Sequence, residues 1–245
     1  MSAPEVRVFA DADEVATRAA DAVIAHLSLV LGEKPEAHLV VTGGTVGILT
    51  LAKLSSIDDG LDWNRVHIWW GDERFVEHDS ADRNAVQARN AWLTASSIPE
   101  SNIHEFPASN QGLSLDEAAI SFDETLARFG AGAAHPQFDI LLLGMGPDGH
   151  IASLFPGKPQ PEAGLVTLAE HDSPKPPPAR LSMTYDVINS ADQVWFTVAG
   201  ADKADAVEVA FSDSPEALPV GRVRGTAKTV WFVDKAAASK TAAIS

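Results

Sequence analysis

The segment 138–157, FDILLLGMGPDGHIASLFPG, constrains the fold of this chain more than any other. It begins with an apolar run, ILLL, which is typical of a strand buried on both faces of a sheet. Glycines then break the run, and Asp148 and His150 follow. Open α/β sheets bind ligands beyond the carboxyl ends of their strands. The segment therefore predicts the active-site edge of such a sheet, with a short helix beginning at Ile151.

Strands and helices alternate along the rest of the sequence. Apolar runs predict strands at 39–41, 66–70, 180–185, 193–198 and 229–233. Helical periodicity and capping residues predict helices at 11–31, from 45 to 54, at 84–94, at 114–129 and after Gly200. The segment 158–179 is rich in proline and is expected to be a loop, although it resembles a domain linker in composition. Because strands resume after it, we predict one α/β domain over residues 1–245, with a mostly parallel, Rossmann-like sheet covered by helices on both faces.

The charge balance limits the partners. Eighteen Lys and Arg stand against 34 Asp and Glu, so the net charge is −16. Nucleic acid and anionic membranes require a basic face, so neither is expected as a partner. A phosphate site would have to be built locally, from helix N-termini and a few cations. The first residues lack the pattern of a secretory signal, and no apolar stretch approaches the length of a membrane span, so the cytoplasm is the expected location.

The stretch 42–45, TGGT, lies between a predicted strand and a predicted helix. Glycines let the backbone turn sharply there and expose N–H groups at the positive end of the helix dipole, which favours phosphate. A tight connection without any ligand explains the pattern about equally well. The stretch is not G-x-G-x-x-G and no Walker lysine follows, so dinucleotide and nucleoside triphosphate binding are disfavoured.

Charged residues follow the strand 66–70 in the sequence GDERF. Asp72 and Arg74 are two residues apart and can point the same way into a cleft, where the arginine could hold an anion with two hydrogen bonds. The alternative is a solvated surface salt bridge. Two further cations, Arg180 and Lys203, open a strand and a helix; each could support a phosphate, although solvated charges are the more common case.

His150 is the candidate general base, because imidazole titrates near working pH. The other seven histidines are read as surface or satisfied residues. No histidine pair has metal-ligand spacing and there is no cysteine, so neither a metal nor a thiol nucleophile is expected. Nor is there a G-x-S-x-G elbow, and no motif supports Ser153 as a nucleophile. Water activated by His150 is the simplest nucleophile.

Taken in order, these segments resemble the 6-phosphogluconolactonases, within the wider group related to glucosamine-6-phosphate deaminase. VTGGT, WWGDERFV, GMGPDGHIASLFPG, ARLSMTYDVIN and VWFVDKAAA carry the resemblance over nearly the whole chain. The deaminases continue toward Asn-Glu-Pro after the histidine and have Tyr in place of Arg74. One departure lies at Thr45-Val46-Gly47, where the family often has Ser-Thr-Pro; the exact phosphate contacts are therefore open.

The resemblance implies a fold like that of the NagB and ribose-5-phosphate isomerase group, and hydrolysis of 6-phospho-D-glucono-1,5-lactone without a cofactor or metal. It makes His150 the general base, with Asp72 and Asp148 lining the site. The phosphate and ring oxygens would be held by Gly43, Gly44, Thr45, Arg74, Arg180 and Lys203. It also favours a monomer.

Two other functions stay open at this point. An isomerase or deaminase of amino sugar phosphates could use the same acid and base groups, although Arg74 and the SLFPG continuation argue against it. A non-catalytic sugar-phosphate sensor could use the same fold, because a fold does not determine a function. The intact Asp-Gly-His sequence argues against the sensor.

Overall fold

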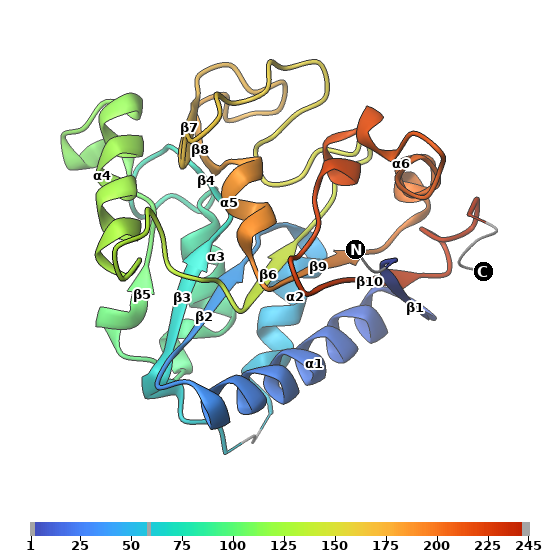
Figure 1. Ribbon diagram of the computed structural model, residues 1–245, viewed down its shortest axis with the longest axis horizontal. Helices are drawn as coiled ribbons and strands as arrows, with labels where there is room; N and C mark the ends of the chain where they lie inside the picture. Colours follow the sequence, from blue (N-terminus) through green and yellow to red (C-terminus); the bar gives the residue numbers. More distant parts are fainter. Residues whose placement is uncertain (1–2, 58–59, 242–245) are drawn as a thin grey trace.

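A seven-stranded sheet forms the centre of the molecule (Figure 1). The computed structural model describes residues 3–57 and 60–241. All neighbouring strands of this sheet are parallel, and their order is β1-β10-β9-β6-β2-β3-β5. The strands are β1 (Glu5–Phe9), β2 (Ala37–Val41), β3 (Val66–Trp70), β5 (Ile103–His104), β6 (Ile140–Leu143), β9 (Gln193–Val198) and β10 (Lys228–Asp234). The predicted α/β architecture is confirmed, including the parallel sheet.

Helices cover both faces of the sheet. They are α1 (Ala12–Glu33), α2 (Gly44–Leu54), α3 (Asn84–Ala91), α4 (Leu115–Arg128), α5 (Tyr185–Ser190) and α6 (Ala204–Ala210). Asp11 caps α1 by accepting a hydrogen bond from the amide of Glu14, and a capping box of Ser114 and Glu117 begins α4. In Figure 1, α1 and α2 lie on one side of the sheet and α5 lies on the other.

A second, antiparallel sheet stands beside the first. It consists of β4 (Asp72–Arg74), β8 (Arg180–Met183) and β7 (Thr167–Glu170), in the order β4-β8-β7. The prediction that 158–179 is only loop was therefore wrong, since β7 lies within it. The edge strand β1 and the three-residue strand β4 were also missed, because charged residues interrupt the apolar pattern of both.

Several expected boundaries were wrong. No helix begins at Ile151; a turn with an isolated bridge to Leu154 is found instead, and Ala152 has a left-handed φ of 44°, which an α-helix does not accommodate. The strand predicted over 180–185 ends at Met183, and Tyr185 begins α5. The helix predicted over 84–94 ends at Ala91, and a 3-10 turn follows over Leu93–Ala95.

The helix α1 corrects the expectation that no apolar stretch approaches the length of a membrane span. By length and hydropathy alone, this 22-residue helix could cross a membrane. Its apolar side is nevertheless occupied, since Val15, Ala19, Val23 and Leu27 have no exposed surface and belong to the hydrophobic core. The length and hydropathy of α1 are thus those of a core helix packed along a sheet.

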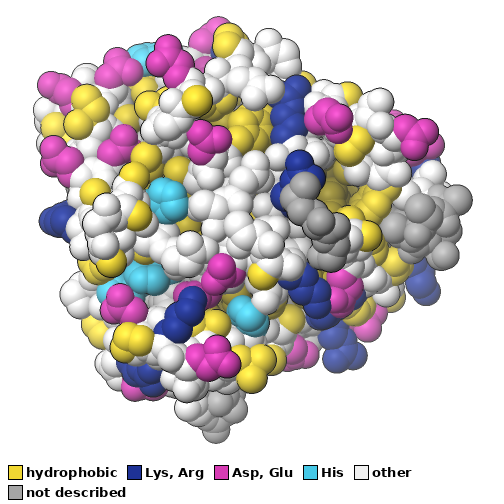
Figure 2. Space-filling model, viewed as in Figure 1, with side chains coloured by type: hydrophobic (Ala, Val, Ile, Leu, Met, Phe, Trp, Pro, Cys, Tyr) yellow, Lys and Arg dark blue, Asp and Glu magenta, His cyan; other side chains and the backbone are white. Residues whose placement is uncertain are grey.

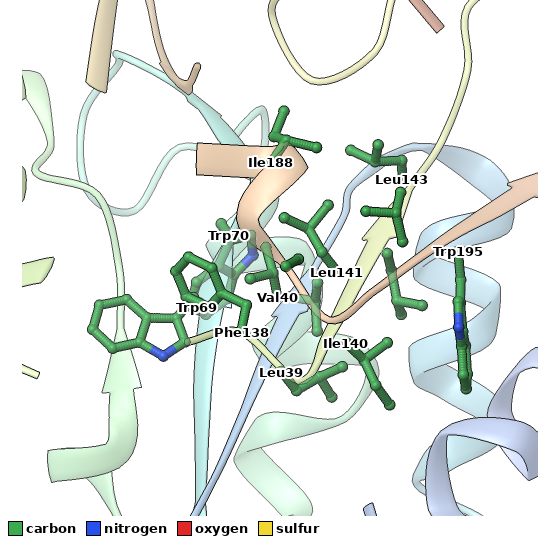
Figure 3. Close-up of a cluster of buried hydrophobic side chains, with 14 of the residues drawn as sticks. Leu39, Val40, Trp69, Trp70, Phe138, Ile140, Leu141, Leu143, Ile188 and Trp195 are labelled. Carbon is green, nitrogen blue, oxygen red and sulfur yellow. The ribbon is translucent and has the colours of Figure 1, made fainter. Parts of the chain in front are cut away.

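The core is dense around the central strands (Figure 3). Every residue of β2, β3 and β6 is buried, which agrees with their mainly apolar sequences; the exceptions are His38 in β2 and His67 in β3. The largest fully buried side chains include Trp69 and Trp70 on β3 and Phe138 before β6. This packing fixes the carboxyl ends of β2, β3 and β6, where the candidate residues lie.

Candidate active site

The site lies where the chain reverses its direction across the sheet. From β2 the chain proceeds to β3 on one side, whereas β6 and β9 lie on the other side of β2. The loops after β2 and β6 meet at this point, and the amide of Gly144 donates to Oγ1 of Thr42 at 3.4 Å. A topological switch point of this kind forms a crevice that binds ligands in open α/β sheets.

A cavity of about 600 Å³ opens at this crevice. Eight of the nine candidate residues line it: Gly43, Gly44, Thr45, Asp72, Arg74, His150, Arg180 and Lys203. The ninth, Asp148, does not line the cavity but contacts His150 directly. The structure thus brings together residues that are up to 160 positions apart (203 minus 43).

Asp148 and His150 form the chemical centre of the cavity. Asp148 Oδ1 lies 2.5 Å from His150 Nδ1, and the ring of Phe155 packs against the imidazole with its centroid 4.7 Å away. The backbone between the two residues turns tightly at Gly149, whose φ of 75° favours glycine. With Nδ1–H donating to the carboxylate, Nε2 of His150 is the nitrogen that can accept a proton.

The environment sets the charges of this pair in opposite ways. Burial raises the pKa of Asp148, but hydrogen bonds from His150 and Lys175 outweigh it and bring the pKa to about 2, so the carboxylate is charged at neutral pH. Burial is the largest influence on His150 and lowers its pKa below the usual 6.5, against the raising effect of Asp148. An unprotonated imidazole beside a charged carboxylate is the state that a general base requires.

Asp72 is held from two sides. Ser153 is fully buried and donates its hydroxyl to Asp72 Oδ2 at 2.6 Å. From the start of α3, the side-chain amide of Asn84 donates to the backbone oxygen of Asp72 at 2.9 Å. Ser153 thus orients the carboxylate of Asp72, which faces the cavity, and does not itself line the cavity.

The loop after β2 brings bare backbone to the cavity. Gly43 caps α2 without a side chain, so the first amides of the helix are left without the side-chain acceptor that a Ser or Asp cap would supply. A Cβ at Gly43 would lie 2.0 Å from Asn84 Oδ1, which explains why glycine is needed here. Backbone amides at a helix N-terminus form an anion site when cations lie nearby.

Three cations surround this anion site, and each has a protein partner. Lys203 Nζ lies 3.0 Å from Asp202 Oδ2, and Arg74 Nη1 donates to the backbone oxygen of Asp82 at 2.6 Å. The side chain of Arg180, whose residue is 5% exposed, donates to three backbone oxygens in the segment 175–177. Arg180 faces the cavity, yet these hydrogen bonds tie it to the loop before β8.

Sequence reasoning missed two residues of the site. Lys175 lines the cavity and contacts both Asp148 and His150, but it lies in the proline-rich segment that was read as loop. Asn84 lines the cavity as the first residue of α3 and had been treated only as a helix start. The available signals were a polar residue at the start of a predicted helix, Asn84, and a lysine before consecutive prolines, Lys175. Unless the fold is known, neither signal indicates that the residue belongs to a site.

Charged side chains of both signs lie on the surface of the molecule. On the face shown in Figure 2, acidic and basic side chains are interspersed. Within residues 3–57 and 60–241, no group of three or more His, Asp or Glu side chains is arranged to hold a metal ion.

A partly buried histidine–carboxylate pair, a helix N-terminus and several cations thus meet at the switch point of an α/β enzyme fold. Residues 10–231 match the family described as glucosamine-6-phosphate isomerases/6-phosphogluconolactonase, and the chain belongs to this family.

Relatives and solved structures agree with this assignment. A 6-phosphogluconolactonase of Mycobacterium tuberculosis is 39% identical over 240 residues, which covers 96% of this chain and 97% of the relative. The crystal structure of a 6-phosphogluconolactonase from Thermotoga maritima is 28% identical, with a TM-score of 0.83 over 95% of this chain and all of that one. A monomeric glucosamine-6-phosphate deaminase, at 20% identity and a TM-score of 0.78 over 96% of this chain and 99% of that one, shares the fold.

Proposed function

We propose that this chain hydrolyses 6-phospho-D-glucono-1,5-lactone to 6-phosphogluconate, with His150 as the general base. The observation that carries the proposal is His150, which lies 2.5 Å from Asp148 and lines one cavity with the helix N-terminus at Gly43 and with Lys203. The relatives of this chain that carry the name 6-phosphogluconolactonase match it over nearly its whole length, which supports the same substrate.

In the proposed reaction, water is the nucleophile. His150 Nε2 takes a proton from water as the oxygen attacks C1 of the lactone, and the carbonyl becomes a tetrahedral oxyanion. The C1–O bond to the ring oxygen then breaks, and the imidazolium returns its proton to that oxygen, which gives an open-chain acid. The carboxylate of Asp148 stabilises the transient imidazolium and holds the tautomer that leaves Nε2 free.

In this proposal, the phosphate group of the substrate orients the lactone in the site. We propose that the amides at Gly43, Gly44 and Thr45 bind the phosphate together with Lys203 and Arg74, and that Asp72 accepts hydrogen bonds from sugar hydroxyls. Binding energy from a remote phosphate fixes C1 against the base, which lowers the entropic part of the barrier. A lactone is already an activated ester, so a base and an anchored substrate suffice for catalysis.

The test compares two substrates at equal enzyme concentration. The lactone is generated in situ and its spontaneous hydrolysis is subtracted, and ammonia release is followed from glucosamine 6-phosphate. Acceleration of lactone hydrolysis without ammonia release supports the proposal. Ammonia release without lactone turnover would indicate a deaminase, and binding of 6-phosphogluconate without turnover of either substrate would indicate a sensor.

The remaining expectations form part of the same proposal. We infer that the chain works as one domain and as a monomer in the cytoplasm. Gel filtration with light scattering tests the monomer, since a second species at twice the mass of 25.9 kDa would contradict it.

A further inference from the structure

We propose that Lys175 is a positioning residue of this site: its ammonium group holds Asp148 against His150 and keeps the imidazole unprotonated. This inference rests on the proposed function of His150 as a base. Lys175 Nζ lies 3.1 Å from Asp148 Oδ1 and 3.1 Å from His150 Nδ1. One cation therefore touches both members of the pair.

The donors and acceptors of the three side chains determine which hydrogen bond Lys175 makes. An ammonium group is only a donor, and Nδ1 already shares its proton with Asp148 Oδ1. Lys175 therefore donates to the carboxylate and lies beside the ring as a positive charge. A cation in this place disfavours a second proton on the imidazole, whereas Asp148 favours it.

The groups around His150 act in both directions. Asp148 and, from the start of β4, Asp72 raise the pKa of His150. Burial, to which the ring of Phe155 contributes by packing on the imidazole, lowers the pKa, and so does Lys175. The two carboxylates act against burial, and Lys175 adds to the effect of burial. The lysine is the one facing cation among these influences within the described part of the chain.

The loop before β8 is built to hold Lys175 in this position. Arg180 donates Nη2 to the backbone oxygens of Lys175 and Pro176, at 3.0 and 3.1 Å, and donates Nε to that of Pro177 at 3.0 Å. Ser173 donates its hydroxyl to the oxygen of Lys175 at 2.9 Å and accepts from its amide at 3.2 Å. These five hydrogen bonds fix the backbone of a loop that consecutive prolines already stiffen.

The chain also offers a matched control outside this loop. Lys158 is another partly exposed lysine near the same loop, and it pairs with Glu170 at 3.1 Å. It does not line the cavity of His150. Lys158→Met therefore removes a paired lysine from the same region without changing the charge beside the imidazole.

The test is a pair of measurements on wild type, Lys175→Met, Lys175→Arg and Lys158→Met. The first is the pKa of the His150 ring, followed by NMR and assigned with a His150→Asn variant, which requires no activity. The second is the pH profile of kcat/KM for lactone hydrolysis. In Lys175→Met we expect the His150 pKa to rise and the acidic limb to move to higher pH, with about tenfold lower kcat/KM below the limb for each unit moved.

The outcomes separate this inference from the proposed function. Lys175→Arg should retain most of the wild-type profile, and Lys158→Met should match the wild type. An unchanged His150 pKa in Lys175→Met would overturn the inference, even in an active enzyme. A raised KM with an unshifted limb would likewise overturn it, because it would assign Lys175 to phosphate binding. A wild type without lactone turnover would refute the proposed function, while the NMR result would still decide the role of Lys175.

Discussion

A cluster of three buried histidines predicts that this protein loses stability in mild acid. His38, His67 and His104 lie side by side on β2, β3 and β5; the ring of His67 stacks on those of His38 and His104, and His104 also stacks on Trp69. Nε1 of Trp69 donates to Nδ1 of His38 at 3.1 Å, so that nitrogen must be unprotonated. His67 Nδ1 and His104 Nε2 share one proton at 3.0 Å. A proton on Nδ1 of His38 breaks the first contact, and a second proton placed between His67 Nδ1 and His104 Nε2 breaks the other.

The magnitude follows from the pKa shifts. Burial, with repulsion from neighbouring histidines, lowers the pKa of His38 from 6.5 to about 4 and that of His104 to about 3. The unfolded chain takes up these protons near pH 6.5 and the folded chain does not, so the stabilising contribution is complete above that pH and is lost below it. Between about pH 7 and about pH 5, each of the two histidines costs about 2 kcal/mol.

Other groups act on the same pH range. Glu36 lies 3.6 Å from His38 Nε2 and 3.5 Å from His67 Nε2, and it moderates the shift of both histidines. Burial raises the pKa of Glu73 to about 7, which adds stability as the pH falls and partly offsets the histidines. A comparison between wild type and a single variant removes the contribution of Glu73, because it is common to both.

The assay is urea unfolding of wild type and His104→Phe between pH 5 and pH 8. The destabilisation caused by His104→Phe should shrink by about 2 kcal/mol from pH 7 to pH 5, because only the wild type loses the contribution of this histidine. His171→Asn, at an exposed histidine, should run parallel to the wild type. A His104→Phe curve that is also parallel to the wild type would refute the reasoning.

The other predictions concern the site and its supports. Gly43→Ala places a Cβ 2.0 Å from Asn84 Oδ1. It should lower the free energy of unfolding in urea by about 1–3 kcal/mol and should also lower lactonase activity. Unchanged stability would contradict the contact. Glu73→Ala removes the carboxylate that accepts from the amides of Asn84 and Ala85 and faces the buried guanidinium of Arg83, which keeps Glu105 as a second partner; it should cost about 3 kcal/mol in urea unfolding, and unchanged stability would contradict these contacts. Asp148→Asn should lower kcat about 100-fold at a similar KM, and a kcat near that of wild type would remove Asp148 from its role.

The parts of the fold that the sequence could predict are those in which the signal is local. β3 and β9 begin and end at the predicted residues, because each is an apolar run bounded by polar or glycine residues. The helices predicted from residues 11 and 114 begin there because Asp11 and Ser114 cap them, and capping depends on side chains within three positions. Almost every residue of β3 and β9 is buried in the central sheet, and this burial limits where each strand can begin and end.

The missed parts depend on contacts between distant residues. β4 contains a buried glutamate, Glu73, which is acceptable only because the amides of Asn84 and Ala85 and the guanidinium of Arg83 meet it. The hydrogen bond from Ser153 to Asp72 joins residues 81 positions apart. No local pattern contains such information, and it appears only when the two sheets are brought together.

The same distinction applies to the candidate site. Glycines and charged residues directly after buried strands were found because parallel strands end at one edge of the sheet. Lys175 was missed because its loop returns to that edge only through the hydrogen bonds of Arg180. Arg180 itself was assigned to phosphate from its charge, and the structure adds a second set of partners that the sequence could not indicate.

The central claim is that His150 activates water for lactone hydrolysis. The most direct test measures hydrolysis of 6-phosphogluconolactone by wild type and His150→Ala, with the spontaneous rate subtracted and phosphate-end binding followed separately with 6-phosphogluconate. We predict acceleration by wild type, a loss of about 100-fold or more in kcat for the variant, and similar binding of 6-phosphogluconate by both. A variant that hydrolyses the lactone at a rate near that of wild type would contradict the account.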